Sequence, residues 1–201
     1  KSDDPKAPEN ASLIMEEMWE RYDEGDKSLA PDVISYNSLI DAWSKSAHPE
    51  AGKKADNVLR EMWKMHGDDP QLDIKPDQSS YNTVISSWAK SGDPGGPENA
   101  SRILAEMWER YDHGDKSLVP NAISYNALIN VWINCSRPDS EKEVENILQD
   151  LSKRQGTNPE LDKFLDRCAS EEHTGRFWTK GKAQDNAKVV GEARSRDIGT
   201  N

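Results

Sequence analysis

The stretch "PDVISYNSLIDAWSKS", residues 31–46, has the pattern of a helix that begins after a proline and an aspartate. It is repeated twice, as "PDQSSYNTVISSWAKS" at residues 76–91 and "PNAISYNALINVWINC" at residues 120–135. The three tyrosines lie 45 and 44 residues apart, and the three tryptophans keep the same spacing. Self-similarity at a fixed period of this size indicates a repeat protein.

A second landmark keeps the same period. "EMWERYDEGDKSLAPD" at residues 17–32 returns as "EMWERYDHGDKSLVPN" at residues 106–121, and a looser copy, "EMWKMHGDDPQLDIKPD", lies between them at residues 61–77. Each landmark runs into one copy of the tyrosine stretch, so the repeating unit contains both. This unit is longer than the tetratricopeptide repeat of about 34 residues.

Each tyrosine stretch predicts an amphipathic helix. Its apolar side chains are spaced by three or four residues and therefore share one face. In the first copy they are Tyr36, Leu39, Ile40 and Trp43. A short polar side chain that can cap the first turn precedes each stripe, namely Asp32, Asp77 and Asn121. At this helical spacing the tyrosines and tryptophans are expected in the core.

A second helix is predicted in each unit. Its starts are marked by proline and acidic residues at Pro49-Glu50, Pro97-Glu98 and Asp139-Ser140-Glu141. Its apolar stripes are Val58, Leu59, Met62 and Trp63 in one unit and Ile103, Leu104, Met107 and Trp108 in the next. Strand-like alternation is absent from the sequence. Because one hairpin of this size cannot bury its own stripe, the hairpins are expected to stack into an all-α solenoid.

The repeats divide the chain into five parts. A partial repeat, consisting of a second helix and its loop, is expected at residues 1–32, full repeats at 33–77 and 78–121, and a third, diverging repeat at 122–154. Residues 155–201 break the pattern and are expected to form a helix that caps the last hairpin, followed by a mobile end; a diverged final repeat is the alternative. The apolar side of the capping helix holds Leu161, Phe164, Leu165 and Cys168.

Composition and motifs exclude several classes of protein. No apolar run approaches the roughly 18 residues of a membrane span, and neither a secretory signal nor an Arg-rich presequence opens the chain. Because the chain begins at Lys1, we expect a fragment or a processed form, which leaves its destination open. Metalloprotease, nucleotide-binding and serine-hydrolase motifs are absent, and the 4 histidines share no metal-binding spacing. We therefore expect no enzyme activity, metal or cofactor.

One polar position recurs on the first helices. Asn37, Asn82 and Asn126 follow the three tyrosines and lie on a stripe turned away from the apolar face. In a stack of repeats these stripes line up along one surface. An amide both donates and accepts hydrogen bonds, so one amide per repeat suits modular recognition of bases. A local hydrogen bond or cap inherited with the helix is the equally open alternative.

The pattern of the repeats resembles that of a known protein family. The two-helix unit, the "SYNxLI" start of the first helix and the "KPD" or "VPN" end of the repeat are similar to the pentatricopeptide repeat, an α-solenoid RNA-binding family of organelles. The resemblance covers residues 8–154. It implies sequence-selective binding of single-stranded RNA, a part in organellar RNA metabolism, and location in the mitochondrion or plastid (chloroplast).

The family pattern also implies roles for individual residues. The residues that would read bases are Asn37 paired with Asp77, Asn82 paired with Asn121, and Asn126, which has no assigned partner. Those that would pack against a base are Ile34, Ser79 and Ile123, and those that would meet phosphate are Lys45 and Lys90. The first pair implies uracil and the second implies cytosine, or pyrimidine generally. A preference for pyrimidine RNA is therefore expected.

The net negative charge of the chain favours a protein partner over RNA. Lys and Arg number 26 against 37 Asp and Glu, a net charge of -11, whereas nucleic-acid binders usually carry a basic surface. Residues 155–201 hold eight basic and eight acidic residues, so the repeats carry the whole excess. The alternative function is a protein-protein interaction scaffold of the tetratricopeptide-like type. The acidic balance favours that scaffold, and the repeated asparagine favours RNA.

Overall fold

The computed structural model describes residues 6–46, 48–135, 137–154 and 163. Seven α-helices and two short 3₁₀ turns occur in these residues, and none of them forms a strand. The helices are α1 (Ala7–Asp23), α2 (Val33–Lys45), α3 (Ala51–Asp68), α4 (Gln78–Ser91), α5 (Gly96–Asp112), α6 (Ala122–Asn134) and α7 (Ser140–Lys153). The predicted all-α, helical-repeat fold is confirmed. The capping helix and mobile end predicted for 155–201 lie outside the described residues, apart from Lys163.

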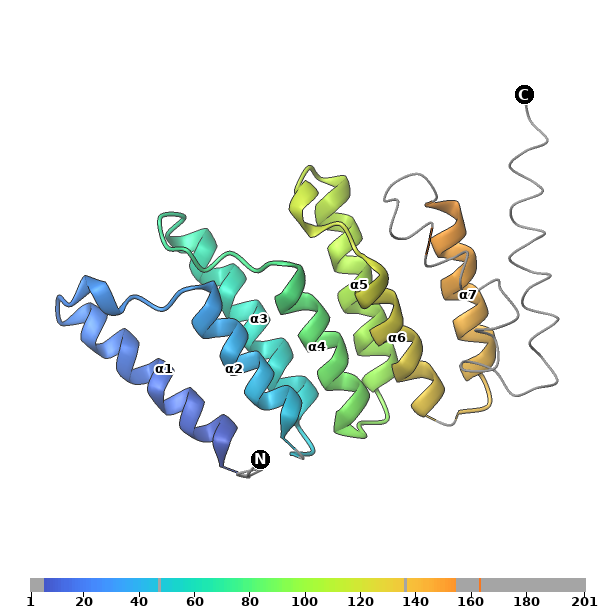
Figure 1. Cartoon of the computed structure of the whole chain (residues 1–201), viewed down its shortest axis with the longest axis horizontal. Coiled ribbons are helices and arrows are strands. Elements are labelled where there is room, and N and C mark those ends of the chain that lie inside the picture. Colours follow the sequence, from blue (N-terminus) through green and yellow to red (C-terminus); the bar gives the residue numbers. More distant parts are fainter. Residues whose placement is uncertain (1–5, 47, 136, 155–162, 164–201) are drawn as a thin grey trace. The chain divides into compact units, whose positions relative to one another are not determined.

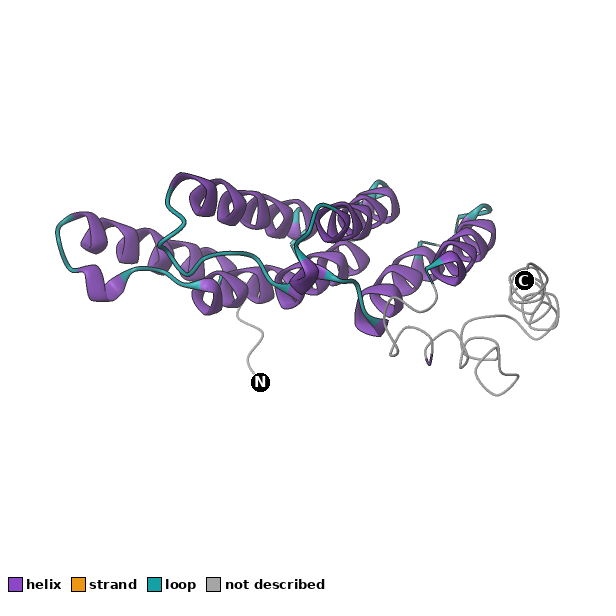
Figure 2. Ribbon diagram, turned by 90° about the horizontal axis from the view of Figure 1, so that it is seen from above, coloured by secondary structure: helices purple, strands orange, loops and turns teal. Residues whose placement is uncertain are grey.

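The helices alternate between two types. The tyrosine stretches form the first helices α2, α4 and α6, and the remaining helices are second helices. The chain divides into two compact units, Lys1–Pro120 and Asn121–Asn201. In the first unit α2 packs on α3 and α4 packs on α5, and the first helices α2 and α4 also contact each other (Figure 1). Figure 2 shows α2 and α4 in one layer and α3 and α5 in the other.

Side-chain caps start the first helices, as predicted. Asp32 accepts a hydrogen bond from the Ser35 backbone N–H at 2.8 Å, and Asp77 accepts one from the Ser80 backbone N–H at 2.9 Å. In the second unit Asn121 caps α6 in the same way. These bonds satisfy backbone N–H groups that lack a partner within the helix, which fixes where each first helix begins.

The core is built from the predicted aromatic and aliphatic stripes. Tyr36, Tyr81 and Tyr125 are fully buried, and Trp43, Trp88 and Trp132 are nearly so. The second helices contribute Val58, Leu59, Met62, Ile103, Leu104, Met107 and Trp108. Trp63, predicted for the same stripe, is only half-buried and lies at its edge, where the Arg110 guanidinium stands 3.5 Å above the centre of its ring.

Hydrogen bonds of the buried tyrosines connect successive hairpins. The indole N–H of Trp63 on α3 donates to the Tyr81 hydroxyl on α4 at 2.8 Å, and that hydroxyl donates to Glu106 Oε1 on α5 at 2.9 Å. Trp19, Tyr36 and Glu61 repeat this arrangement at 3.0 and 3.1 Å. Burial, followed by the neighbouring carboxylate, raises the pKa of both tyrosines, so each hydroxyl keeps its proton and remains a donor.

The loop that follows each of the second helices α3 and α5 forms a hydrogen bond with the start of the first helix of the same repeat. The Val33 backbone N–H at the start of α2 donates to the Asp73 carbonyl at 2.6 Å, and the Gln78 side chain at the start of α4 donates to the Val119 carbonyl at 2.9 Å. Lys75 and Asp115 link two successive loops through an ion pair of 2.8 Å. The extra residues of this long repeat therefore brace the capped ends of the first helices.

The second unit is a single hairpin among the residues described. α6 packs on α7, and Val144, Leu148 and Leu151 of α7 are buried. In the turn between the two helices the Arg137 guanidinium lies 5.4 Å from the centre of the Trp132 ring. This hairpin repeats the helix order seen in the first unit.

Loss of the Asp32 cap is expected to cost about 1 kcal/mol of unfolding free energy in an Asp32→Ala variant at neutral pH. The backbone N–H and hydroxyl of Ser35 hold the pKa of the Asp32 carboxyl below its usual range. A lowered pKa gives stability that is present above the unfolded-state pKa and is lost as the pH falls through the folded-state value. Urea denaturation should therefore show the difference between wild type and variant narrowing in acid.

Asp32→Asn is the matched control for this cap. Asparagine is an equally good cap, and Asn121 already serves α6. The amide does not titrate in this range, so Asp32→Asn should keep nearly full stability at neutral pH and show no acid-dependent loss from this position. An Asp32→Ala cost that stays constant down to strongly acidic pH would contradict the assignment.

Candidate nucleic-acid interface

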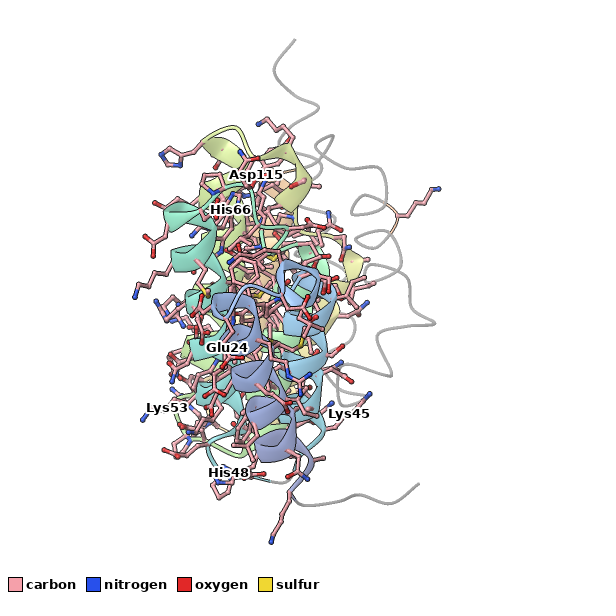
Figure 3. The ribbon with its side chains drawn as sticks, turned by 90° about the vertical axis from the view of Figure 1, so that its left-hand side faces the viewer. Glu24, Lys45, His48, Lys53, His66 and Asp115 are labelled. Carbon is pink, nitrogen blue, oxygen red and sulfur yellow. The ribbon has the colours of Figure 1, made fainter. Side chains whose placement is uncertain are left out.

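The candidate interface is the outward side of the first helices α2 and α4, which we call the first-helix face. It consists of Ile34, Asn37 and Asp41 on α2 and of Ser79, Asn82 and Ser86 on α4. Figure 3 shows the side chains of Lys45 on α2 and Lys53 on α3 pointing outward on opposite sides of the molecule. The first-helix face is therefore turned away from the layer of second helices.

Asn37 and Asp77, the first predicted base-reading pair, lie in contact. The Asn37 Nδ2 donates a hydrogen bond to Asp77 Oδ1 at 3.3 Å, although 40 residues separate the two in sequence. Asp77 is exposed and Asn37 is half-buried. Ile34 precedes Asn37 by about one turn of α2 and is 70% exposed. The fold thus places an apolar side chain close to an amide–carboxylate pair.

Asp77 serves two elements through a single oxygen. Its Oδ1 accepts the Ser80 backbone N–H that caps α4 as well as the amide of Asn37 on α2. The other carboxylate oxygen, Oδ2, makes neither of these bonds. Capping therefore holds Asp77 at the junction of two repeats without using the whole carboxylate.

The second predicted pair, Asn82 and Asn121, is divided between the two compact units. Asn82 on α4 is 8% exposed, which makes it less accessible than Asn37. The Asn121 side chain accepts the backbone N–H groups of Ile123 at 2.9 Å and Ser124 at 3.2 Å. Asn126 is half-buried on α6. Pairing of Asn82 with Asn121 and base reading by Asn126 stay predictions.

Two of the three predicted base-packing residues are conspicuously exposed. Ile34 is 70% and Ile123 is 63% exposed, and large apolar side chains this open are few among the described residues. Apart from Ile34 and Ile123, the large apolar side chains that are exposed in the described residues are Leu13 and Ile14 on α1. Ser79, which is also exposed, offers little apolar surface at the equivalent place on α4. The first repeat therefore presents the better apolar contact for a base.

The two predicted phosphate-binding lysines lie near the C-terminal ends of α2 and α4. Lys90 Nζ donates to the Ser44 hydroxyl at 3.3 Å, which brings it beside the residue that precedes Lys45. Lys45 is 70% exposed in its side chain and forms an ion pair with Asp41 one turn earlier on α2. Both ammonium groups thus have partners on α2, and Asp41 neutralises part of the positive charge beside the first-helix face.

If single-stranded RNA binds along the first-helix face, Asp41→Ser is expected to tighten that binding about twofold to threefold. The carboxylate competes with phosphate for Lys45, and an exposed i,i+4 pair of this kind contributes only about 0.5 kcal/mol. Serine is the natural choice because Ser86 occupies the equivalent position on α4. Fluorescence anisotropy in low salt measures the change. Glu17→Ser on α1 removes the same charge from another i,i+4 pair and should leave the affinity nearly unchanged.

Sequence reasoning missed Ser80. Its hydroxyl lies 2.6 Å from Asn37 Oδ1, so it belongs to the same cluster as the predicted base-reading pair. A signal was present, since a serine precedes each of the three repeated tyrosines. The sequence alone assigns such a serine to the first turn of a helix, and its contact with the preceding repeat is visible only in the fold.

An open depression of about 690 Å³ on α3 and α5 is the other polar feature missed from sequence. Its lining includes three arginines, Arg60, Arg102 and Arg110, but each has a carboxylate partner. Asp56 pairs with Arg60 and Arg102, and Glu106 pairs with Arg110. Burial raises the pKa of Asp56, against the effect of its arginines. Because acidic groups balance the basic ones, the depression is a weak candidate for an anion site.

No metal-binding group of three or more His, Cys, Asp or Glu side chains occurs in the part of the chain that the structure describes. Over the same part, every helix is too short or too polar to cross a membrane.

Comparison with known proteins supports a family resemblance for part of the chain. The family model for the pentatricopeptide repeat domain matches residues 57–134, from within α3 to the end of α6. Proteins of this family generally bind RNA, generally lack enzyme activity and are typically organellar. No curated protein and no solved structure matches the chain. The family model therefore supports, over residues 57–134, the resemblance to the pentatricopeptide repeat.

Proposed function

We propose that the chain binds single-stranded RNA sequence-selectively along its first-helix face and performs no chemistry on it. The observation that carries this proposal is the hydrogen bond between Asn37 and Asp77 beside the exposed Ile34. Buried or local roles would not need an exposed isoleucine next to an amide–carboxylate pair. Recognition of an unstacked base does need both, an apolar surface for its ring and polar groups for its edge.

The parts of the site would act together on one nucleotide. Ile34 packs against the ring of the base, while Asn37 and Asp77 form hydrogen bonds with its edge. Lys45 and Lys90 lie further along the same helices and attract the phosphates. The pair implies uracil at this repeat, and the Asn82 and Asn121 pair implies cytosine at the next, with Ser79 as the weaker packing residue. Asn126 and Ile123 supply the corresponding groups on α6.

RNA binding is expected to be weak, because the chain has few repeats and a negative net charge. Two base-reading pairs and two lysines make few contacts, and a net charge of -11 opposes long-range attraction of RNA. We expect weak, salt-sensitive binding with a preference for pyrimidines. The family resemblance supports a role in RNA metabolism in the mitochondrion or plastid, which fractionation of cells that produce the protein would test.

The experiment that tests the proposal is fluorescence anisotropy of the chain in low salt with labelled oligonucleotides of equal length. Oligouridylate and oligocytidylate should bind more tightly than oligoadenylate and than oligothymidylate DNA. An Asn37→Ala variant should lose about tenfold of the affinity for oligouridylate, since a base hydrogen-bonded by paired groups contributes about 1–3 kcal/mol. Circular dichroism should confirm that the variant keeps its helices.

Asn10→Ala is the matched control, because Asn10 is an exposed asparagine on α1 and does not belong to the first-helix face. It should bind as the wild type does. If none of the oligonucleotides binds at high micromolar protein, RNA binding by this chain is wrong and a protein-protein interaction scaffold becomes the better assignment. That function is favoured by one observation, the excess of acidic residues.

A further inference from the structure

We propose that Ser80 is a positioning residue that fixes the orientation of the Asn37 amide and thereby sets which pyrimidine the first repeat prefers. The inference rests on the proposed RNA binding and adds a residue from the neighbouring repeat to the base-reading pair. Ser80 is fully buried in the first turn of α4 and has no access to the base itself. Its influence therefore passes through Asn37.

The hydroxyl of Ser80 has one proton and two acceptors within reach. Its Oγ lies 2.6 Å from Asn37 Oδ1 and 3.1 Å from Asp77 Oδ1, and it accepts the Asp77 backbone N–H at 3.1 Å. A hydroxyl donates a single hydrogen bond, and 2.6 Å is the shorter of the two distances. The proton of Ser80 is therefore assigned to the Asn37 carbonyl oxygen.

The neighbouring carboxylate requires the same orientation of the amide. An ionised Asp77 only accepts hydrogen bonds, so the Asn37 atom that faces it must be Nδ2. Rotation of the amide by half a turn would put the Asn37 oxygen against Asp77 and its NH₂ against Ser80. Asp77 therefore excludes the flipped state, and the hydrogen bond from the Ser80 hydroxyl to Asn37 Oδ1 holds the amide in the same orientation from the other side.

A fixed amide gives the site a definite pattern of donor and acceptor. The second hydrogen on Asn37 Nδ2 and the Asp77 Oδ2 take no part in the bonds within the cluster. They present one donor beside one acceptor. Uracil and cytosine both offer an acceptor beside a donor, but the ring and exocyclic positions of the two are exchanged. Discrimination between them consequently depends on where the Asn37 N–H is held.

Ser35 provides a matched control in the same chain. It occupies the position of Ser80 in α2, and its hydroxyl donates to the Asp32 cap at 2.7 Å. No first helix precedes α2 among the described residues, so Ser35 faces no equivalent of Asn37. Ser35→Ala and Ser80→Ala both remove a hydroxyl that lies within hydrogen-bond distance of a cap carboxylate, but only Ser80→Ala removes a hydrogen bond to a base-reading amide.

The test compares wild type, Ser80→Ala, Ser80→Cys and Ser35→Ala in anisotropy titrations with oligouridylate and oligocytidylate of equal length. The measured quantity is the ratio of the two dissociation constants. Ser80→Ala should bring that ratio about threefold to tenfold closer to one, as loss of one buried hydrogen bond implies. Ser35→Ala should leave the ratio within about twofold of wild type, since its bond lies away from Asn37.

Ser80→Cys protects the test against a folding defect. Cysteine nearly keeps the size of serine but is a weak donor, so it should also weaken the preference while the helices remain intact by circular dichroism. Unchanged ratios in folded Ser80→Ala and Ser80→Cys would overturn the role of Ser80 and leave RNA binding standing. Absence of RNA binding by the wild type would instead refute the proposed function, and this inference with it.

Discussion

Tyr81→Ala is expected to lower the free energy of unfolding by about 3 to 5 kcal/mol, the range for truncation of a large buried aromatic side chain. Tyr81 is fully buried on α4. Its hydroxyl also links Trp63 on α3 with Glu106 on α5. Truncation leaves a cavity in the layer between two hairpins and removes the partner of an indole N–H. Urea denaturation followed by tryptophan fluorescence measures the loss.

Tyr81→Phe separates the ring from the hydroxyl. It keeps the packing and removes only hydrogen bonds, of which the one to Glu106 is charge-assisted, so a loss of about 1.5 to 3 kcal/mol is expected. A loss of about 3 to 5 kcal/mol is a large part of the unfolding free energy of a small domain. Tyr81→Ala is therefore expected to have a short folded baseline in urea, whereas the unfolding transition of Tyr81→Phe should remain measurable. Equal losses for the two variants would show that the ring contributes nothing, contrary to its burial.

Gly52→Ala is expected to destabilise the chain by about 1 to 3 kcal/mol, although alanine normally favours a helix over glycine. Gly52 lies in the first turn of α3, where a Cβ would stand 2.5 Å from Trp88 Cε3 and 2.6 Å from Trp88 Cδ2. Trp88 is itself nearly buried, so its ring cannot move aside without opening the core. Thermal and urea denaturation both report the loss.

Gly67→Ala in the same helix is the matched control. A Cβ at Gly67 meets no atom within 4 Å, and the residue lies in the last turn of α3. Here alanine only reduces the freedom of the unfolded chain, so the variant should be stabilised by up to about 1 kcal/mol. The two identical substitutions are expected to change stability in opposite directions. A stabilising Gly52→Ala would contradict the close approach of α3 to Trp88.

The fold was predictable because its determinants are local and repeated. The stripe that includes Tyr36 and Trp43 fixes one face of each first helix, and Asp32 marks its start. Three copies of the same pattern make chance agreement unlikely, and the period gives the order of helices directly. The role of the long loops was not predicted, because the hydrogen bond from the Val33 N–H to the Asp73 carbonyl joins backbone atoms and leaves no side-chain pattern in the sequence.

The candidate site was predictable in part. The resemblance pairs Asn37 with Asp77, and the fold brings these two side chains into contact. Ser80 could not be assigned because its bond to Asn37 spans 43 residues, and a serine in a first helical turn already has a local explanation. The burial of Asn82 was also hidden, since helical spacing gives a direction on the helix but not how closely the neighbouring elements cover it.

Acidic and basic side chains lie close together near the surface proposed for RNA binding. Asp41 lies on the first-helix face, and Asp77 and Lys45 contact residues of that face, so the surface proposed for RNA carries both negative and positive charges. Asp77 takes part in base reading under the proposal, whereas Asp41 only weakens Lys45. Affinity for RNA can therefore be low while selectivity at one base is retained, because phosphate contacts and base contacts contribute separately.

The most direct test of base reading is the exchange of Asp77 for asparagine. Asparagine caps a helix as well as aspartate does, so Asp77→Asn should fold normally, and the family pattern implies that the preference moves from uracil to cytosine. Dissociation constants for oligouridylate and oligocytidylate should be measured for wild type and Asp77→Asn under identical salt. A reversal of their ratio, by about tenfold in total, is the predicted result. A ratio that is the same in both proteins would contradict base reading by the Asn37 and Asp77 pair.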